Sequence, residues 1–321
     1  MPDPAVSVII PAYQSAQYVK AALDSVFEQS FKDYEVIVVN DGSPDTTELE
    51  AVLTPYRSRI TYIRQENQGL AGARNAGIRA AHGRFMAPLD ADDIWCPEHL
   101  ESQVAVLEAD PSIDVVYADA RIFGNSNAAG KTVMDLCPSS GTVTFEALVT
   151  RRCTVHVCVS VCRISALQRE GLFDATLRRG EDIDMWLRIA AGGGRIVYRK
   201  RVLGNYRRHA GSLSADPVPM HEAFAAVLAK VSRDPRLTLA QRQIAERQCV
   251  IERAAADLER GKRAFLAGDA DGALAGLTRA NEHFKSRKIA AILTLLRVAP
   301  RLLRAVYQWR SRRVLRLKTQ P

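Results

Sequence analysis

The stretch Arg84-Phe85-Met86-Ala87-Pro88-Leu89-Asp90-Ala91-Asp92-Asp93 decides the fold class of this chain. Its apolar residues predict a short buried strand, which must end where the three carboxylates begin. In an α/β pattern, such a strand end lies at the rim where open parallel sheets bind ligands. Carboxylates this close together repel one another unless a cation shares them, and Mg²⁺ takes one or two carboxylates together with substrate phosphates. Taken alone, the stretch is more typical of a polar turn before the helix expected from Pro97.

Strands and helices alternate on the amino-terminal side of this stretch. Apolar runs predict buried parallel strands at Val6–Ile10, Tyr34–Val39 and Ile60–Arg64. Apolar residues at helical spacing predict helices from Ser15 to Phe27, near 45–53 and over 71–80. The alternation predicts an α/β fold with a doubly wound sheet and helices on both of its faces.

Polar side chains recur where these strands end. Asp41 follows the second strand, Arg74 lies on the helix after the third, and Asp90–Asp93 follow the fourth. An acid can accept from a base or ribose, an Arg can hold a phosphate, and an acid pair can hold a metal. A turn at Asp41 and a solvated helix face at Arg74 are the simple alternatives, but the recurrence favours one shared site.

Four motifs in this half occur in a fixed order. They are Val8-Ile9-Ile10-Pro11-Ala12-Tyr13, Glu35-Val36-Ile37-Val38-Val39-Asn40-Asp41-Gly42-Ser43, Asn67-Gln68-Gly69 with Ala73-Arg74-Asn75-Ala76-Gly77, and Leu89-Asp90-Ala91-Asp92-Asp93. With them, the chain from Val6 to Asp93 resembles the nucleotide-binding half of a family 2 glycosyltransferase with the GT-A fold, a Rossmann-like, doubly wound mixed sheet. The glycine-rich dinucleotide fingerprint is missing after the first strand, which argues against a dehydrogenase.

The resemblance implies a role for each matching residue. It assigns the pocket for base and ribose to Pro11, Ala12 and Tyr13, the acceptor of the base to Asp41, and the ribose contact to Asp90. It places Arg74 near the nucleotide, and it makes Asp92 a ligand of the Mn²⁺ or Mg²⁺ that bridges the diphosphate. The implied donor is a nucleotide-diphosphate sugar, most simply a UDP-sugar.

The following residues predict an acceptor half. Helices are expected over Pro97–Glu108 and Phe145–Val149, and strands over Val115–Asp119, Val155–Arg163, Ile196–Tyr198 and Val202–Leu203. The polar, glycine-rich segment Gly124–Gly141 is expected to be a mobile loop over the site.

A second acidic cluster, Glu181 and Asp182, precedes a helix whose expected buried stripe is Ile183, Trp186, Leu187 and Ala190. Carboxylates at a helix amino end are usually caps. The resemblance instead makes Asp182 the catalytic base. Inverting transfer needs one carboxylate to take the proton of the attacking hydroxyl, whereas the leaving diphosphate needs a metal and positive charge.

The segment Tyr206–Ser214 resembles the loop that closes this domain in the family. His209 is its candidate ligand for the metal or a phosphate, and a solvated loop histidine is the alternative. The Gln-x-x-Arg-Trp motif of processive family 2 synthases and long apolar spans are both missing, which favours one sugar per encounter.

The six cysteines form no disulfide-dense framework, and the chain begins without a signal peptide, so a reducing cytoplasm is expected. Zinc at Cys153, His156, Cys158 and Cys162 is disfavoured because the Cys-x-x-Cys spacing is missing.

The carboxyl-terminal part has a different composition. Residues 1–216 are assigned to a GT-A domain, with a nucleotide-binding half at 1–95 and an acceptor half at 96–216, and residues 217–321 to a helical extension. Residues 264–274 predict the turn of one helical hairpin of the tetratricopeptide kind, too little for a solenoid.

The basic charge is concentrated at the end of the chain. Eleven Lys or Arg and no acid occur from Lys285 onward, which leaves −3 of the overall +8 for the preceding residues. Apolar stripes at Ile289, Ile292, Leu293 and Leu296, and at Leu302, Leu303, Val306 and Tyr307, fit an amphipathic helix on an anionic membrane surface. A packed terminal helix fits equally well, and no motif supports nucleic-acid binding.

These patterns favour an inverting, metal-dependent transferase that moves one sugar to a hydroxyl of a saccharide or lipid-linked acceptor, in cell-surface polysaccharide or glycolipid synthesis. It is expected in the cytoplasm or at the cytoplasmic face of the membrane. A nucleotidyltransferase is the first alternative, but Pro11–Gln17 lacks a basic, glycine-rich phosphate loop. A non-catalytic nucleotide-sugar-binding scaffold is the second, and Asp41, Asp92 and Asp182 speak against it.

Overall fold

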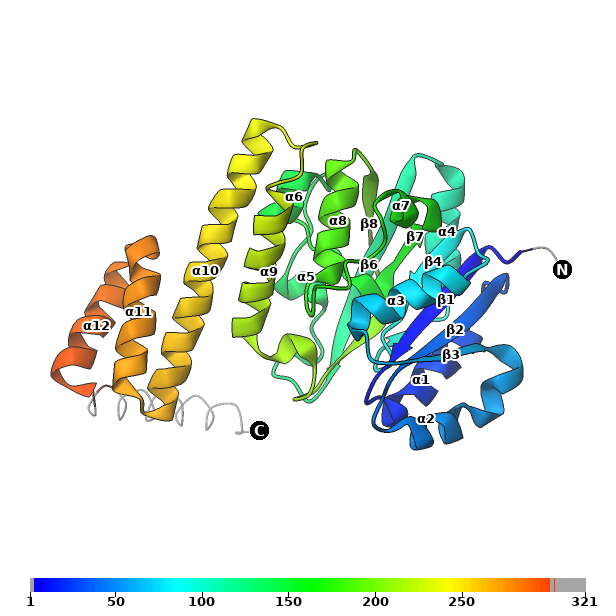
Figure 1. The fold of residues 1–321 in the computed structure, drawn as a ribbon, viewed down its shortest axis with the longest axis horizontal. Helices are drawn as coiled ribbons and strands as arrows, with labels where there is room; N and C mark the ends of the chain where they lie inside the picture. Colours follow the sequence, from blue (N-terminus) through cyan, green and yellow to red (C-terminus); the bar gives the residue numbers. More distant parts are fainter. Residues whose placement is uncertain (1–2, 301–302, 304–321) are drawn as a thin grey trace. The chain divides into compact units, whose positions relative to one another are not determined.

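The computed structural model describes residues 3–300 and residue 303 (Figure 1). The chain divides into two compact units, one of residues 1–215 and 227–245 and the other of residues 216–226 and 246–321. The first unit contains one eight-stranded sheet in the order β3-β2-β1-β4-β7-β6-β8-β5. Its strands are β1 Val6–Ala12, β2 Tyr34–Asp41, β3 Thr61–Gln65, β4 Phe85–Pro88, β5 Ile94–Trp95, β6 Ile113–Gly124, β7 Ser160–Arg163 and β8 Arg195–Arg208.

The sheet is mixed. Strands β1, β2, β3 and β4 are parallel, β7 runs antiparallel between β4 and β6, and β8 is parallel to β6 and antiparallel to β5. The helices of this unit are α1 Ala16–Phe27, α2 Thr46–Leu53, α3 Gly69–Ala80, α4 His99–Ala109, α5 Val133–Leu136, α6 Phe145–Val149, α7 Ile164–Arg169 and α8 Glu181–Ala191, with 3₁₀ turns η1 Thr54–Arg59, η2 Val157–Val159 and η3 Leu213–Ala215.

Strand β1 explains why the sequence has continuous apolar runs. Val8 and Ile10 share a core cluster with buried residues of α1, α2 and α4 on one face of the sheet. Ile9 points to the other face, where it lies so close to Gly77 of α3 that a Cβ there would be 2.4 Å from Ile9 Cγ2. A strand covered on both faces needs apolar residues at every position. The expected doubly wound, mixed α/β sheet is confirmed.

Three local expectations were wrong. Only Ser160–Arg163 of the expected strand 155–163 pairs in the sheet, because the residues before it form the turn η2. The two short final strands are one long strand, β8, which pairs with β6 on both sides of residues 199–201. In α8 the buried stripe includes Met185 and Ile189 beside Trp186 and Leu187, whereas Ile183 and Ala190 are half-buried.

The helical part continues with α9 Pro217–Val231, α10 Leu239–Ala267, α11 Ala270–Phe284 and α12 Arg287–Val298. The expected hairpin turn lies between α10 and α11, where the Asp269 side chain accepts from the Gly272 backbone N–H at 2.8 Å. Gly261 and Gly276 let the two helices approach closely, since a Cβ on Gly276 would lie 2.7 Å from the Gly261 nitrogen.

The last described helix, α12, is packed on one side. Leu293 and Leu296 are buried with Ala273 and Leu277 of α11. Of the second expected stripe only Leu303, which packs on this cluster, belongs to the described residues; Leu302, Val306 and Tyr307 lie outside them. No helix in the described part of the chain combines the length and apolar composition that crossing a bilayer requires.

Candidate active site

The side chain of Arg74 joins two halves of the candidate site. It is fully buried on α3, and its Nη2 donates to Asp90 Oδ1 at 2.8 Å, just beyond the end of β4. Its Nη1 donates to Glu181 Oε1 at 2.6 Å, at the start of α8. Burial alone would lower the pKa of Arg74, but Asp90 and Glu181 raise it, so the guanidinium stays charged. Arg74 would therefore act on a bound nucleotide indirectly, by orienting the carboxylates of Asp90 and Glu181.

The carboxylates after β4, those of Asp90, Asp92 and Asp93, lie close together and are largely shielded from solvent. Burial alone would raise the pKa of Asp90, but the Arg74 charge and a bond from the Cys158 thiol lower it. Burial and the Asp90 charge raise the pKa of Asp92. Burial and both neighbouring acids raise the pKa of Asp93 well above its usual range. Crowding thus makes Asp92 and Asp93 easier to protonate, and a bound cation would relieve the repulsion among their ionised forms.

The end of β8 delivers two residues to this cluster. Arg207 binds it twice, since its backbone N–H donates to Asp93 Oδ1 at 2.7 Å and its side-chain Nε donates to the Asp92 carbonyl at 2.7 Å. His209 Nε2 lies 3.1 Å from Asp92 Oδ2, and its Nδ1 accepts from the Gly211 N–H at 3.2 Å. In neutral His209 the ring proton is therefore on Nε2, and this N–H donates a hydrogen bond to Asp92 Oδ2.

A divalent cation fits Asp92 and His209. Asp92 Oδ2 and His209 Nε2 are 3.1 Å apart, so these two atoms would be able to hold one ion between them. The metal would replace the Nε2 proton. Asp90, Asp93 and Cys158 also bring one ligand atom each within 4.8 Å of one another. Burial raises the pKa of the Cys158 thiol, and a protonated thiol does not suit a hard cation, so this second group fits Mn²⁺ or Mg²⁺ poorly.

Asp182 lies beside the Arg74 bridge at the amino end of α8. It is half-buried, and its Oδ1 accepts from the Ile183 N–H at 2.8 Å. Burial, followed by the charge of Glu181, raises the pKa of Asp182 to about 7, although Arg74 acts in the opposite direction. Asp90 also contributes to this rise, so the two carboxylates lie within electrostatic reach of each other. A carboxylate with this pKa can take up a proton near neutral pH.

The residues assigned to the donor pocket lie at the ends of β1 and β2. Pro11 and Ala12 are buried at the end of β1, whereas Tyr13 is 49% exposed. Asp41 is buried, and its Oδ1 accepts from Gln65 Nε2 at 2.7 Å and from the Gln68 N–H at 2.8 Å. These bonds hold the Asp41 carboxylate in place at the rim where β1, β2 and β4 end.

Sequence reasoning missed two residues that build this cluster and underrated a third. Cys158 was considered only as a disfavoured zinc ligand, Arg207 only as part of the segment Tyr206–Ser214, and Glu181 only as the neighbour of Asp182 or a helix cap. A buried Arg facing Glu181 could not be found from local spacing, because the pair spans 107 positions. Among the described residues, Cys153, His156, Cys158 and Cys162 form no joint metal group.

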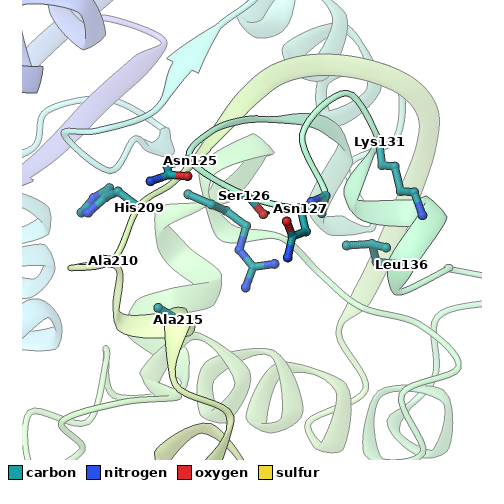
Figure 2. A pocket seen from close by; sticks show the side chains of 10 residues that line it. Asn125, Ser126, Asn127, Lys131, Leu136, His209, Ala210 and Ala215 are labelled. Carbon is teal, nitrogen blue, oxygen red and sulfur yellow. Dashed lines mark hydrogen bonds between the residues drawn. The ribbon is translucent and has the colours of Figure 1, made fainter. Parts of the chain in front are cut away.

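A pocket of about 480 Å³ adjoins the cluster (Figure 2). Its wall comes from the segment after β6 and from the end of β8, and it consists of Asn125, Ser126, Asn127, Ala128, Lys131, Leu136, Arg208, His209, Ala210 and Ala215. The segment expected to be a loop over the site thus lines a pocket beside it. It also contains the short helix α5, which begins with a capping box of Thr132 and Asp135. Its mobility stays a prediction.

Similarity to solved structures agrees with the fold. S. aureus TarS 1–349 in complex with UDP-GlcNAc aligns with a TM-score of 0.63 and 18% identity, covering 89% of this chain and 93% of that one. The mannosyltransferase PcManGT from Pyrobaculum calidifontis, in complex with GDP-Man and Mn²⁺, aligns with a TM-score of 0.61 and 21% identity over 95% of this chain and 88% of that one. The expected GT-A fold is confirmed.

Several relatives are similar in sequence. The Escherichia coli protein named UDP-Glc:alpha-D-GlcNAc-diphosphoundecaprenol beta-1,3-glucosyltransferase WfgD is 33% identical over 190 residues, which are 59% of this chain and 71% of that protein. Uncharacterized glycosyltransferases of Rickettsia bellii and Rickettsia prowazekii are each 32% identical, over 64% and 65% of this chain. The chain spans only 30% and 65% of the length of these two proteins.

The family itself follows from the extent of the match. The sequence model of Glycosyl transferase family 2 matches residues 7–169, which include the strand-end acids, Arg74 and Cys158. The WfgD match extends over more than two thirds of that protein at more than 30% identity. This chain therefore belongs to family 2 of the glycosyltransferases.

Proposed function

We propose that this chain is an inverting, metal-dependent glycosyltransferase that moves one sugar per encounter from a nucleotide-diphosphate sugar to a hydroxyl. The observation that carries the proposal is the Arg74 bridge, because it ties the acids after β4 to the start of α8 beside Asp182. Donor-binding and base chemistry are thereby combined at one rim. A UDP-sugar is the proposed donor, with Pro11, Ala12, Tyr13 and Asp41 around the base and Asp90 at the ribose.

Asp182 is the proposed base. In its ionised form it takes the proton of the acceptor hydroxyl while that oxygen bonds to the anomeric carbon and the diphosphate leaves with the bonding electrons. Its pKa of about 7 suits this task, because such a carboxylate is about half ionised at pH 7 and is still basic enough to take up a proton. Arg74 neutralises Glu181, which leaves Asp182 as the acid available for the hydroxyl.

Asp92 and His209 are the proposed ligands of Mn²⁺ or Mg²⁺, which when bound would neutralise charge on the leaving diphosphate. The crowded acids favour a cation at this position, and their oxygen atoms suit a hard one. Arg207 keeps the cluster in place through its bonds to Asp93 and to the Asp92 carbonyl.

The proposed acceptor is a saccharide or a lipid-linked saccharide, in polysaccharide or glycolipid synthesis at the cell surface. The name of the similar WfgD protein points to a diphosphate-linked lipid acceptor for that enzyme. A cytoplasmic enzyme that works at the membrane surface would suit such an acceptor.

Helix α12 is the proposed membrane contact. Ile292, Leu295 and Val298 are 39%, 49% and 80% exposed on a helix that also carries Arg287, Lys288 and Arg297. Exposed apolar side chains with basic neighbours suit an anionic lipid surface. Co-sedimentation with phosphatidylglycerol vesicles should exceed that with phosphatidylcholine vesicles, and Leu295→Glu should reduce it. Equal binding to both vesicle types would refute this contact.

Thermal unfolding with a panel of nucleotide sugars, with and without Mn²⁺, tests the enzymatic proposal. A specific donor raises Tm because it binds only the folded chain. The donor identified in this way is then used to measure turnover by wild type and Asp182→Asn. Retained donor binding with lost turnover supports catalysis at Asp182. Normal turnover in Asp182→Asn would overturn the assigned base, and turnover with release of pyrophosphate would instead indicate a nucleotidyltransferase.

A further inference from the structure

The pocket beside His209 has two positive charges that the described structure leaves without an ion pair. Lys131 is exposed, and no carboxylate of the described residues lies within ion-pair distance of it or of Arg208. The Nη2 of Arg208 makes only a long bond of 3.5 Å to the Ser214 carbonyl. None of the ten lining residues is acidic, and Asn125 and Asn127 add amide groups to the wall. This is the chemistry of an anion site.

The backbone fixes where these two cations stand. Lys131 returns to the end of β6, where its carbonyl accepts from the Ile122 N–H at 2.8 Å. Arg208 lies opposite Gly124 in the pairing of β8 with β6. Gly124 has a φ of +90°, and a Cβ there would lie 2.7 Å from the Arg208 carbonyl oxygen. The pocket is therefore built on the carboxyl ends of two adjacent parallel strands, the usual place for ligands in such sheets.

The pocket is separate from the proposed donor residues. Pro11, Tyr13, Asp41, Arg74 and Asp90 do not line it. His209 is the shared element, since it belongs to the pocket wall and its Nε2 faces Asp92. Figure 2 shows His209 and Asn125 at one end of the pocket and Lys131 with Leu136 at the other. A ligand held by Lys131 would thus reach toward the metal ligands from outside the donor site.

We propose that this pocket binds the phosphate or diphosphate of a negatively charged sugar acceptor, with Lys131 and Arg208 as the recognising cations. The identification of the ligand as an acceptor rests on the proposed function. The volume of about 480 Å³ lies within the range of small-molecule pockets, about 300–1,000 Å³, and leaves room for a saccharide beside the phosphates. The exposed side chain of Leu136 at the far end offers an apolar contact next to the charged one.

Binding of inorganic pyrophosphate, measured by calorimetry on the full chain in EDTA, tests the pocket without turnover. Wild type should bind one pyrophosphate, and Lys131→Gln and Arg208→Gln should each weaken binding roughly tenfold, because each removes one charge-assisted contact. Lys200→Gln is the matched control, since Lys200 is an exposed cation of the same strand as Arg208 and lies outside the pocket. Equal affinities in all four proteins, or no binding in wild type, would refute the proposal.

Competition with UDP and Mn²⁺ shows whether the pocket binds the phosphate of the acceptor or that of the donor. If the pocket serves the acceptor, saturating UDP leaves pyrophosphate binding unchanged. If UDP displaces pyrophosphate and Lys131→Gln weakens UDP to the same extent, the pocket belongs to the donor and the acceptor assignment is wrong. Failure of UDP to bind while pyrophosphate binding persists would count against the proposed donor chemistry and not against this pocket.

Discussion

The Nη1 atom of Arg74 lies 2.6 Å from Oε1 of Glu181, a residue 107 positions later in the chain. Both side chains are almost fully buried, at 1% and 5% exposure. The second arm of the same guanidinium holds Asp90. A single cation therefore sets the relative position of the acids after β4 and the first turn of α8, and this arrangement supports the idea that the two act in one reaction.

Replacement of Arg74 should be severely destabilising. Arg74→Met leaves Glu181 buried without its cation, and breaking a buried pair in this way costs about 3–5 kcal/mol. The free energy of unfolding in urea should fall by that amount. Arg84→Met is the matched control, because Arg84 pairs with Glu108 at the surface, where a pair contributes about 0–1 kcal/mol. Similar losses in the two variants would mean that the Arg74 bridge is not a buried ion pair in solution.

The rate of sugar transfer should rise with pH through neutrality. Asp182 acts as a base only when ionised, and its pKa is about 7. Single-turnover rates should therefore increase about tenfold per pH unit well below pH 7 and level off above it. Asp182→Asn should lower the rate by roughly a hundredfold to ten-thousandfold, with no such rise with pH. A rate that is constant from pH 5 to 8 in wild type would contradict the role of Asp182.

Binding of the metal that transfer requires should depend on Asp92 and His209. Chelation by EDTA should abolish transfer, and Mn²⁺ should restore it. Asp92→Asn and His209→Gln should each weaken Mn²⁺ binding in the presence of UDP by at least about tenfold, because each removes one ligand. Asp110→Asn serves as a control, since Asp110 is an exposed acid paired with Arg195. Electron paramagnetic resonance of free Mn²⁺ measures all three, and an affinity unchanged in both site variants would rule out these ligands.

Substitutions at Gly124 and Gly130 distinguish the effect of backbone strain from the effect of a close contact. Gly124 and Gly130 have φ values of +90° and +87°, so alanine is strained at either by about 1–3 kcal/mol. A Cβ at Gly130 meets no atom within 4 Å, whereas one at Gly124 meets the Arg208 carbonyl at 2.7 Å. Gly124→Ala should thus lower Tm more than Gly130→Ala does. Only Gly124→Ala should displace Arg208 and weaken the binding of pyrophosphate. An equal fall in Tm in both variants would show that the contact between residue 124 and the Arg208 carbonyl relaxes without a cost in stability.

Strands buried on both faces were predictable from the sequence. Val6–Ile10 and Tyr34–Val39 are continuous apolar runs, and they are β1 and β2. The ends of β2 and β4 could be predicted to within about two residues, because Asp41 is the last residue of β2 and Asp90 lies just after β4. The order of motifs then pointed to the correct family.

Structure that depends on distant partners was not predictable from local pattern. Two short strands were predicted, at Ile196–Tyr198 and Val202–Leu203, but β8 is one strand, because β6 pairs with it on both sides of residues 199–201. The register between these strands shifts near Tyr117 and Asp119, which hides any regular alternation. The partners of Arg74 likewise come from β4 and α8, and no spacing rule connects them.

The shared guanidinium of Arg74 also constrains how such enzymes can be recombined. A hybrid that takes its first four strands from one parent and the remainder from another inherits the cation from the first and the Glu181 counterpart from the second. Unless both parents use the same pair, the hybrid has a solitary charge in its interior. Exchange of donor specificity by module swapping therefore requires that α3 and the first turn of α8 be transplanted together.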